Sequence, residues 1–175
     1  IYIYFYKQFL RIIMIIKIGN EVPNTQIFRM VEGKIQKFFL HDLILKKKII
    51  LLGMPGAFTP TCSEEHLPNY INNISNFHNK GIEVICLIVN DLYIAELWEK
   101  ESGARKSGLK IYSDPKSHFA KKTGLIFSAP EIGFVNRLQR FVMLIDDRII
   151  KFINTEEKRG ICDLTLSENT LKILT

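Results

Sequence analysis

A single cysteine with unusual surroundings is the first residue of this sequence that could carry chemistry. Cys62 follows an apolar run of strand length, 48–54, and a loop that contains Pro55, and a helical repeat of apolar residues begins directly after it. It therefore stands at the start of a predicted helix, where unpaired N–H groups and the positive end of the helix dipole stabilise a thiolate. A thiolate is a nucleophile, and attack on the weak O–O bond of a peroxide would leave a sulfenic acid on the sulfur.

Position alone does not distinguish a reactive cysteine from the inert, small apolar side chain that a buried cysteine usually is. Pro55 and Thr59 stand upstream of Cys62 in the pattern PxxxTxxC, and Arg140 begins a later predicted strand. Taken singly, each has a simpler explanation: Pro55 ends a strand, Thr59 belongs to a turn, and Arg140 pairs with a surface carboxylate. Their combination is what favours a functional site.

The run PGAFTPTCS, residues 55–63, resembles the active-site motif of the peroxiredoxin family. Within that family the sequence is most similar to the atypical type-five group, called type II in plants. The similarity continues in the runs CSEEHLP, VICLIVND and RFVMLIDD, and it covers residues 17–174. The resemblance implies a thiol-dependent peroxidase that reduces hydrogen peroxide and alkyl hydroperoxides through a sulfenic acid on Cys62.

The same resemblance assigns roles to the residues around Cys62, the implied peroxidatic nucleophile. It implies that the Thr59 hydroxyl donates a hydrogen bond to the thiolate and to the peroxide oxygens, and that Pro55 shields the thiolate from water. The fixed charge of Arg140 would stabilise the thiolate and the negative charge on the departing oxygen. Arg137 ranks second for this role, because Arg140 directly precedes a phenylalanine, as in the strand pattern of the family.

His66 lies one helical turn after Cys62 and could act as the general base of a Cys-His pair. No acidic residue follows at a spacing typical of proteases, so a cysteine protease is the weaker alternative. We interpret His66 as a structural or interface residue. Asp146 and Asp147 could form a pair of catalytic carboxylates, but the turn of a β-hairpin explains them more simply.

A peroxidase must reduce its sulfenic acid again, and two further cysteines could take part. Cys86 stands where some relatives carry a resolving cysteine, but its apolar neighbours place it on a buried strand. Cys162 lies near the C-terminal end, where other relatives resolve, in a run that does not match theirs cleanly. We favour a cycle with one cysteine, recycled by glutathione or glutaredoxin. Thioredoxin as the reductant, and Cys86 or Cys162 as the resolving residue, stay open as alternatives.

The composition limits the other function classes. The chain has 175 residues, 47% of them hydrophobic, which fits one globular domain. Its 24 Lys and Arg against 18 Asp and Glu are scattered and lack the motifs of a nucleic-acid binder. Three cysteines without a CxxC pair favour a reducing compartment. No metal-ligand cluster or phosphate-binding glycine loop is visible, so we expect no metal and no cofactor.

Residues 1–16 form a predicted N-terminal extension to a domain that spans 17–175. The extension is apolar and aromatic, but charged and polar residues interrupt it, so it predicts neither a membrane span nor a secretory signal. Met14 opens the run MIIKIGNEVP, and we interpret residues 1–13 as a targeting remnant or an over-extended gene start. We expect a cytoplasmic protein, with an organelle matrix as the alternative, and no membrane or nucleic-acid partner.

The apolar runs predict an α/β domain. Predicted strands are 34–40, 48–54, 82–89, 111–112, 140–145 and 148–153, the last two joined by a turn at Asp146-Asp147. Predicted helices begin at Cys62 with a kink at Pro68, after a cap at Asn90 or Asp91, at residue 117, and after a cap at Ser167. This order predicts a thioredoxin-like fold, a mixed central sheet flanked by helices, with an insertion in its middle.

The resemblance also bears on assembly. Relatives in the resembling group form homodimers through the face that carries the active site, so a homodimer is implied. Phe127 and Phe134, in the predicted loop before Arg140, are exposed apolar candidates for that contact. A second function class stays open: a thioredoxin-fold redox sensor or holdase in which oxidation of Cys62 alters binding to client proteins. Turnover with a recycling thiol distinguishes the two classes, because a sensor would react once and stop.

Overall fold

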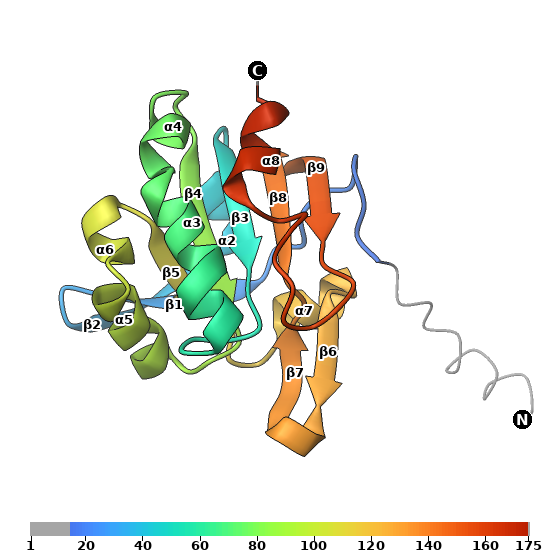
Figure 1. The fold of residues 1–175 in the computed structure, drawn as a ribbon. Coiled ribbons are helices and arrows are strands. Elements are labelled where there is room, and N and C mark those ends of the chain that lie inside the picture. Colours follow the sequence, from blue (N-terminus) through green and yellow to red (C-terminus); the bar gives the residue numbers. More distant parts are fainter. Residues whose placement is uncertain (1–14, 175) are drawn as a thin grey trace, which may run out of the picture.

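A seven-stranded sheet forms the centre of the protein in the computed structural model, which describes residues 15–174 (Figure 1). Its strand order is β2-β1-β5-β4-β3-β8-β9, and a separate two-stranded sheet pairs β6 with β7. The central sheet is mixed: β3, β4 and β5 are parallel to one another, whereas β8 and β9 extend it with antiparallel strands. The predicted architecture, a mixed sheet flanked by helices, is confirmed.

The elements follow one another along the chain in an alternating α/β order. The strands are β1 (Gln26–Val31), β2 (Lys34–Phe39), β3 (Lys48–Gly53), β4 (Glu83–Ile88), β5 (Lys110–Ser113), β6 (Ile126–Ala129), β7 (Phe134–Leu138), β8 (Phe141–Asp146) and β9 (Ile149–Thr155). The helices are α2 (Leu40–Ile44), the π-helix η1 (Cys62–His66), α3 (Leu67–Asn72), α4 (Ile74–His78), α5 (Leu92–Glu101), α6 (Ala104–Ser107), α7 (His118–Thr123), the 3-10 helix η2 (Pro130–Ile132) and α8 (Ser167–Lys172).

Strands β3 and β4 lie at the centre of the sheet because their sequences, KIILLG and EVICLI, are apolar toward both faces. Every residue of the two strands after the first is buried. One core, which includes Tyr70, Phe77 and Trp98, lies between the sheet and helices α3, α4 and α5. The other core includes Ile44 and Phe119 and lies under α2 and α7 on the opposite face.

The helix that carries Cys62 starts with the π-helical turn η1. The N–H of Leu67 donates to the carbonyl of Cys62, five residues earlier. Pro68 has no N–H to donate and its ring crowds the preceding turn, so a wider turn ahead of it relieves the conflict. The kink predicted at Pro68 takes this form. A further interruption at Asn73 separates α3 from α4.

Two predicted turn and cap positions are wrong by one residue. Asp146 belongs to β8 and pairs with Ile149, and the hairpin turns at Asp147 and Arg148, both of which have positive φ. Positive φ at both positions is the conformation of a type I′ turn, one of the two turns that two-residue hairpin loops favour. Ser167 is the first residue of α8, not its cap; the cap position is Leu166. The cap predicted at Asn90 or Asp91 is at Asp91, whose carboxylate accepts two backbone N–H bonds from α5.

Besides the short helices α6 and η2, two features were not predicted. The first is β1, in which a charged residue interrupts the apolar pattern; Arg29 forms an ion pair with buried Glu99 of α5 at 2.9 Å. The second is the β6–β7 hairpin, predicted as a loop, which projects below the central sheet in Figure 1. Phe127 and Phe134 lie on its two strands and contact each other edge to face, with ring centroids 6.2 Å apart. They are partly buried by this contact.

The predicted N-terminal extension, 1–16, lies outside the described residues except for its last two. Of these, Ile16 is buried and its N–H donates to the carbonyl of Thr123 at 2.9 Å. Within residues 15–174, no helix is long and apolar enough to cross a membrane.

Candidate active site

Strand pairing brings Cys62 and Arg140 together. The loop that leads to Cys62 leaves the end of β3 at Gly53, and Arg140 directly precedes β8. Because β3 and β8 are antiparallel, with Gly53 opposite Phe141, the end of one strand lies beside the start of the other. The Phe141 ring packs so closely on Gly53 that a Cβ there would lie 1.9 Å from a ring carbon. The start of the loop to Cys62 and the residue that follows Arg140 thus belong to a tightly packed strand pair.

The Cys62 sulfur lies in a buried, positively charged environment. Its side chain is fully buried, and Arg140 Nη2 donates to Cys62 Sγ at 3.3 Å. The Arg140 side chain is itself buried, so its charge is poorly screened by water and acts strongly on the nearby sulfur. A cation at this distance complements the negative charge of a thiolate, which is the form of cysteine that acts as a nucleophile.

The described hydrogen bonds of the His66 ring go to Arg140 and Thr165, and none goes to Cys62. Arg140 Nη1 lies 3.0 Å from His66 Nδ1, and His66 Nε2 lies 3.1 Å from the carbonyl oxygen of Thr165. Burial and, second, the charge of Arg140 lower the pKa of His66 to about 3. The ring is therefore neutral at physiological pH, which fits a hydrogen-bonding group and not the general base of a Cys-His pair. Its complete burial also does not fit an interface residue.

A hydrogen bond between two of its own residues forms a turn in the loop before Cys62. The Thr59 hydroxyl donates to the carbonyl of Gly56 at 2.8 Å. A hydroxyl has one proton, so in this structure Thr59 does not donate to Cys62, contrary to the expectation. The reason is local: Gly56 is three residues earlier, within reach of a side-chain turn that shapes the loop.

A pocket of about 800 Å³ opens in front of this loop. Pro55, Thr59 and Arg140 form one side of it, and Phe127 and Phe134 of the β6–β7 hairpin form another. The third side is the segment 156–160 that follows β9. Arg140 both lines this pocket and donates to Cys62 Sγ, whereas the fully buried Cys62 is not itself a lining residue, so Arg140 connects the pocket with the sulfur.

Arg137 supports the loop and does not reach Cys62 through any of its described hydrogen bonds. Its Nη1 donates to Asn90 Oδ1 at 3.1 Å and to the Pro55 carbonyl at 3.4 Å. The same Asn90 oxygen accepts the N–H of Ala57 at 3.0 Å. The sequence indicated Asn90 only as a helix cap, yet its side chain fixes the loop between Pro55 and Cys62.

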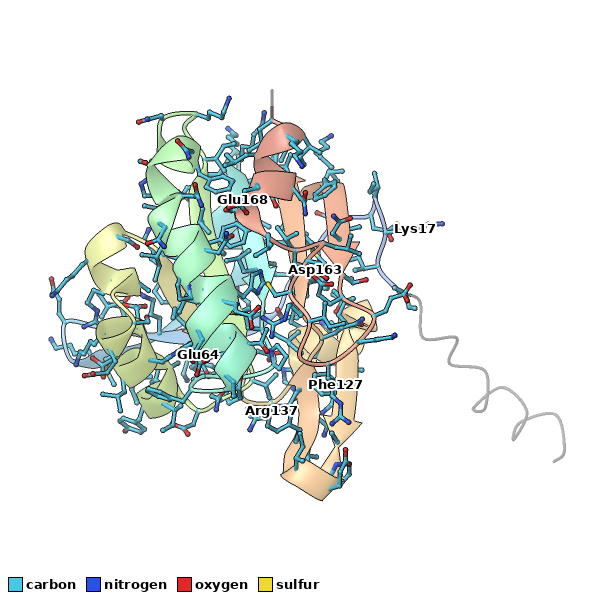
Figure 2. The ribbon with its side chains drawn as sticks, in the orientation of Figure 1. Lys17, Glu64, Phe127, Arg137, Asp163 and Glu168 are labelled. Atoms are coloured by element: carbon cyan, nitrogen blue, oxygen red, sulfur yellow. The ribbon has the colours of Figure 1, made fainter. Side chains whose placement is uncertain are left out.

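The loop that follows β9, residues 156–166 and here called the C-terminal loop, was also missed. Glu156 is buried, and its Oε1 accepts from the N–H of Asp163 and from both the N–H and the hydroxyl of Thr165, at 2.8 to 2.9 Å. Figure 2 shows Asp163 on this loop, on the same side of the molecule as Phe127. The loop has few apolar residues and gives no periodic signal, so only its contacts show its place in the site.

The other two cysteines are buried free thiols. Cys86 lies on β4, and burial, with the nearby Cys62 as the second cause, raises its pKa well above the usual value. Cys162 lies in the C-terminal loop, and burial raises its pKa to about 11. Neither is activated as a thiolate in this conformation. Among residues 15–174, no three His, Cys, Asp or Glu side chains are grouped so as to hold a metal ion.

The comparisons with known proteins agree with this geometry. The model of the family described as Redoxin matches residues 17–170. Peroxiredoxin-2C of Oryza sativa subsp. japonica is 34% identical over 161 residues, which cover 91% of this chain and 98% of that protein.

Two solved structures extend the likeness to three dimensions. Reduced Prx3 in complex with H2O2 from Vibrio vulnificus has a TM-score of 0.85 at 29% identity, with 92% of this chain and 100% of that chain covered. The Plasmodium falciparum antioxidant protein, a 1-Cys peroxiredoxin, has a TM-score of 0.84 at 25% identity, with 91% and 98% covered.

The chain therefore belongs to the redoxin family, and the predicted thioredoxin-like fold is confirmed. Within that family it is a peroxiredoxin, a thiol-dependent peroxidase.

Proposed function

We propose that Cys62 is the peroxidatic residue and that Arg140 is its catalytic partner. The observation that carries this proposal is the hydrogen bond of 3.3 Å from Arg140 Nη2 to Cys62 Sγ, at the wall of the pocket. The guanidinium keeps its charge at every working pH, so it favours the thiolate before the reaction and the developing oxygen anion during it.

The reaction transfers one oxygen atom to the sulfur. The Cys62 thiolate attacks the nearer oxygen of the hydroperoxide, an S–O bond forms, and the O–O bond breaks. Sulfur loses two electrons and becomes a sulfenic acid. The leaving alkoxide or hydroxide takes a proton from solvent and departs as an alcohol or water. Pro55 and Thr59 line the pocket together with Arg140, and we propose that they limit the access of water to the reacting atoms.

We propose hydrogen peroxide and alkyl hydroperoxides as substrates. The related Vibrio vulnificus protein has been crystallised with H2O2. The pocket in front of Arg140 has room for a larger group than a single peroxide, and Phe127 and Phe134 provide an apolar wall for an alkyl chain. When a substrate is bound, the Thr59 hydroxyl can turn its proton from the Gly56 carbonyl toward a peroxide oxygen. This change requires only a rotation of the Thr59 side chain.

For the return to the thiol we propose a cycle with one cysteine. Cys86 and Cys162 are both buried and protonated, and either would need local unfolding to reach Cys62. A structural relative is named a 1-Cys peroxiredoxin. A small thiol such as glutathione would condense with the sulfenic acid, releasing water and leaving a mixed disulfide, which a second thiol or glutaredoxin then reduces.

The experiment that tests this cycle removes both other cysteines. We expect the Cys86→Ala/Cys162→Ala double variant to keep its turnover of hydrogen peroxide when glutathione, glutaredoxin and a regenerating system are supplied. Loss of turnover with glutathione, but not of the first reaction with peroxide, would show that one of the two resolves Cys62. The same assay with thioredoxin compares the two reductants. A protein that reacted once with every thiol tested would be a redox sensor.

Two further proposals concern the oligomeric state of the enzyme and its location in the cell. The hairpin residues Phe127 and Phe134 border the pocket, and Ile132 in η2 and Val135 on β7 are exposed on the same hairpin. This apolar surface supports a homodimer formed through the active-site face, which sedimentation equilibrium would detect. We propose the cytoplasm as the location, with an organelle matrix as the alternative, and imaging of the tagged full chain tests both.

A further inference from the structure

We propose that His66 is a positioning residue that holds the Arg140 guanidinium against Cys62, and that the C-terminal loop holds His66 in turn. This inference rests on the proposed function and explains how the arginine of that site is kept in place. The contact between Arg140 Nη1 and His66 Nδ1 carries it.

The first step concerns the orientation of the guanidinium. Arg140 uses two different nitrogens for its two side-chain contacts, Nη1 at 3.0 Å from His66 Nδ1 and Nη2 at 3.3 Å from Cys62 Sγ. A guanidinium is planar and rigid, so a partner on one terminal nitrogen sets the direction of the other. Without the His66 contact, rotation about the terminal bonds of Arg140 would be limited only by packing, and Nη2 would spend less time at the sulfur.

The second step concerns which His66 nitrogen bears the proton. The partner of Nε2 is the main-chain carbonyl of Thr165, which can only accept a hydrogen bond, so Nε2 must carry the hydrogen. Nδ1 of the neutral ring then has the lone pair that a guanidinium donor needs. The carbonyl of Thr165 thus selects the tautomer that Arg140 requires, as the outer partner of a catalytic or metal-bound histidine does.

The third step connects this contact to the main chain of Arg140 itself. Glu156 Oε1 accepts from the N–H and the hydroxyl of Thr165, and the Glu156 N–H donates to the carbonyl of Arg140 at 3.1 Å. The series Arg140, His66, Thr165 and Glu156 therefore closes into a ring. Tyr70 from α3 adds a further hydrogen bond to the Thr165 carbonyl at 3.0 Å. The C-terminal loop therefore holds the Arg140 guanidinium through Thr165 and His66, and the Arg140 main chain through Glu156.

Two amide substitutions at His66 separate positioning from packing. In His66→Asn the side-chain oxygen can occupy the place of Nδ1 and still accept from Arg140. In His66→Gln the amide reaches the place of Nε2 and can still donate to Thr165, but no acceptor remains at Nδ1. Both variants are neutral and keep the surrounding titratable and charged groups unchanged: Cys62, Arg140, Glu156, Tyr70, Cys86 and Cys162.

Two readouts are measured for each variant: the second-order rate with hydrogen peroxide, and the pH midpoint of Cys62 alkylation by iodoacetamide, followed on the Cys62 peptide by mass spectrometry. We expect His66→Asn to stay near the wild-type rate. We expect His66→Gln to react about 10- to 100-fold more slowly, the worth of one hydrogen bond to a charged group, and its alkylation midpoint to move to higher pH. Equal behaviour of the two variants in both readouts, whether unchanged or impaired, would overturn the proposal.

A measurement on the unmodified protein keeps the proposal testable if a variant does not fold. Nitrogen NMR of 15N-histidine-labelled protein should show His66 with its hydrogen on Nε2 from pH 5 to 8. A hydrogen on Nδ1 would overturn the proposal, since that nitrogen could not accept from Arg140. If the wild-type protein failed to reduce peroxide, the proposed function would be wrong, yet the NMR and alkylation results would still decide this inference.

Discussion

Arg140 Nη2 and Cys62 Sγ lie 3.3 Å apart, although the two residues stand 78 positions apart in the chain. The antiparallel pairing of β3 with β8 creates this proximity, because Gly53 and Phe141 are opposite each other in the register. The pairing of two strands in the central sheet therefore places the cation beside the sulfur. The guanidinium is thus already in place for the negative charge that develops on the departing oxygen, and it need not move during the reaction.

Replacement of Arg140 tests its part in the chemistry. We expect Arg140→Gln to lower the second-order rate with hydrogen peroxide by about 100- to 1000-fold, the usual cost of a lost donor to a developing oxyanion. Arg140→Lys should recover only part of this loss, because a single ammonium nitrogen cannot contact both Cys62 and His66 in the same fork geometry. The matched control is Arg105→Gln on α6, which should change the rate less than twofold. Equal rates for Arg140→Gln and the wild type would contradict the proposed role.

The Asn90 side chain should determine the shape of the loop before Cys62. In Asn90→Ala the N–H of Ala57 loses its acceptor in a buried setting, which should lower the free energy of unfolding by about 1–3 kcal/mol. Because Arg137 loses the same acceptor, the loop should also loosen and the peroxide rate should fall. Asn90→Asp keeps an oxygen in that place and should remain close to wild type. Urea unfolding and stopped-flow kinetics measure the two effects, and identical results for both variants would exclude this explanation.

The carboxylate of Glu156 should stabilise the C-terminal loop. Glu156→Ala removes the acceptor of three hydrogen bonds inside the protein, and we expect the free energy of unfolding to fall by about 1–3 kcal/mol or more. The neighbouring Glu157 is exposed, so Glu157→Ala is the matched control and should change stability by less than about 0.5 kcal/mol. A smaller effect at Glu156 than at Glu157 would count against the ring of contacts around Arg140.

The buried, neutral state of His66 predicts a loss of stability in weak acid. Burial and the Arg140 charge lower its pKa to about 3 in the folded protein, from an ordinary value of 6.5. Between these two values the unfolded chain binds the additional proton, so the free energy of unfolding decreases as the pH falls through this window. From pH 7 to pH 5 the wild-type protein should lose about 2 kcal/mol more than His66→Asn, which has no group to protonate.

Urea unfolding of the two proteins at both pH values tests this prediction. Equal losses for the wild type and His66→Asn would mean that His66 takes up its proton as readily in the folded protein as in the unfolded chain, and would contradict the prediction.

The parts of the site that were predictable from the sequence consist of segments that follow one another closely along the chain. The strand of β3, the loop with Pro55 and Thr59, and the helix start at Cys62 follow one another directly, and Arg140 precedes an evident strand. Their residue types and spacing are therefore enough to predict a reactive thiol and its cation.

The rest depends on contacts that leave no pattern in the sequence. The partner that fixes His66 is a main-chain carbonyl 99 positions away, and every residue has such a group. The β6–β7 hairpin is short and mixes polar with apolar side chains, so its period is too weak to predict strands. The Thr59 hydroxyl donates to the Gly56 carbonyl, a main-chain group whose position depends on the shape of the loop and not on a residue type.

The most direct test of the central claim is stopped-flow reaction of the reduced protein with hydrogen peroxide, with Cys62→Ser beside the wild type. Trp98 is the only tryptophan, and its Nε1–H donates to the hydroxyl of Ser63 at 3.1 Å, so its fluorescence reports on the turn that carries Cys62. We predict a reaction far faster than that of free cysteine, absent in Cys62→Ser and retained in Cys86→Ala/Cys162→Ala. A rate that is slow, or that does not change when Cys62 is replaced, would contradict the role of Cys62 as the peroxidatic residue.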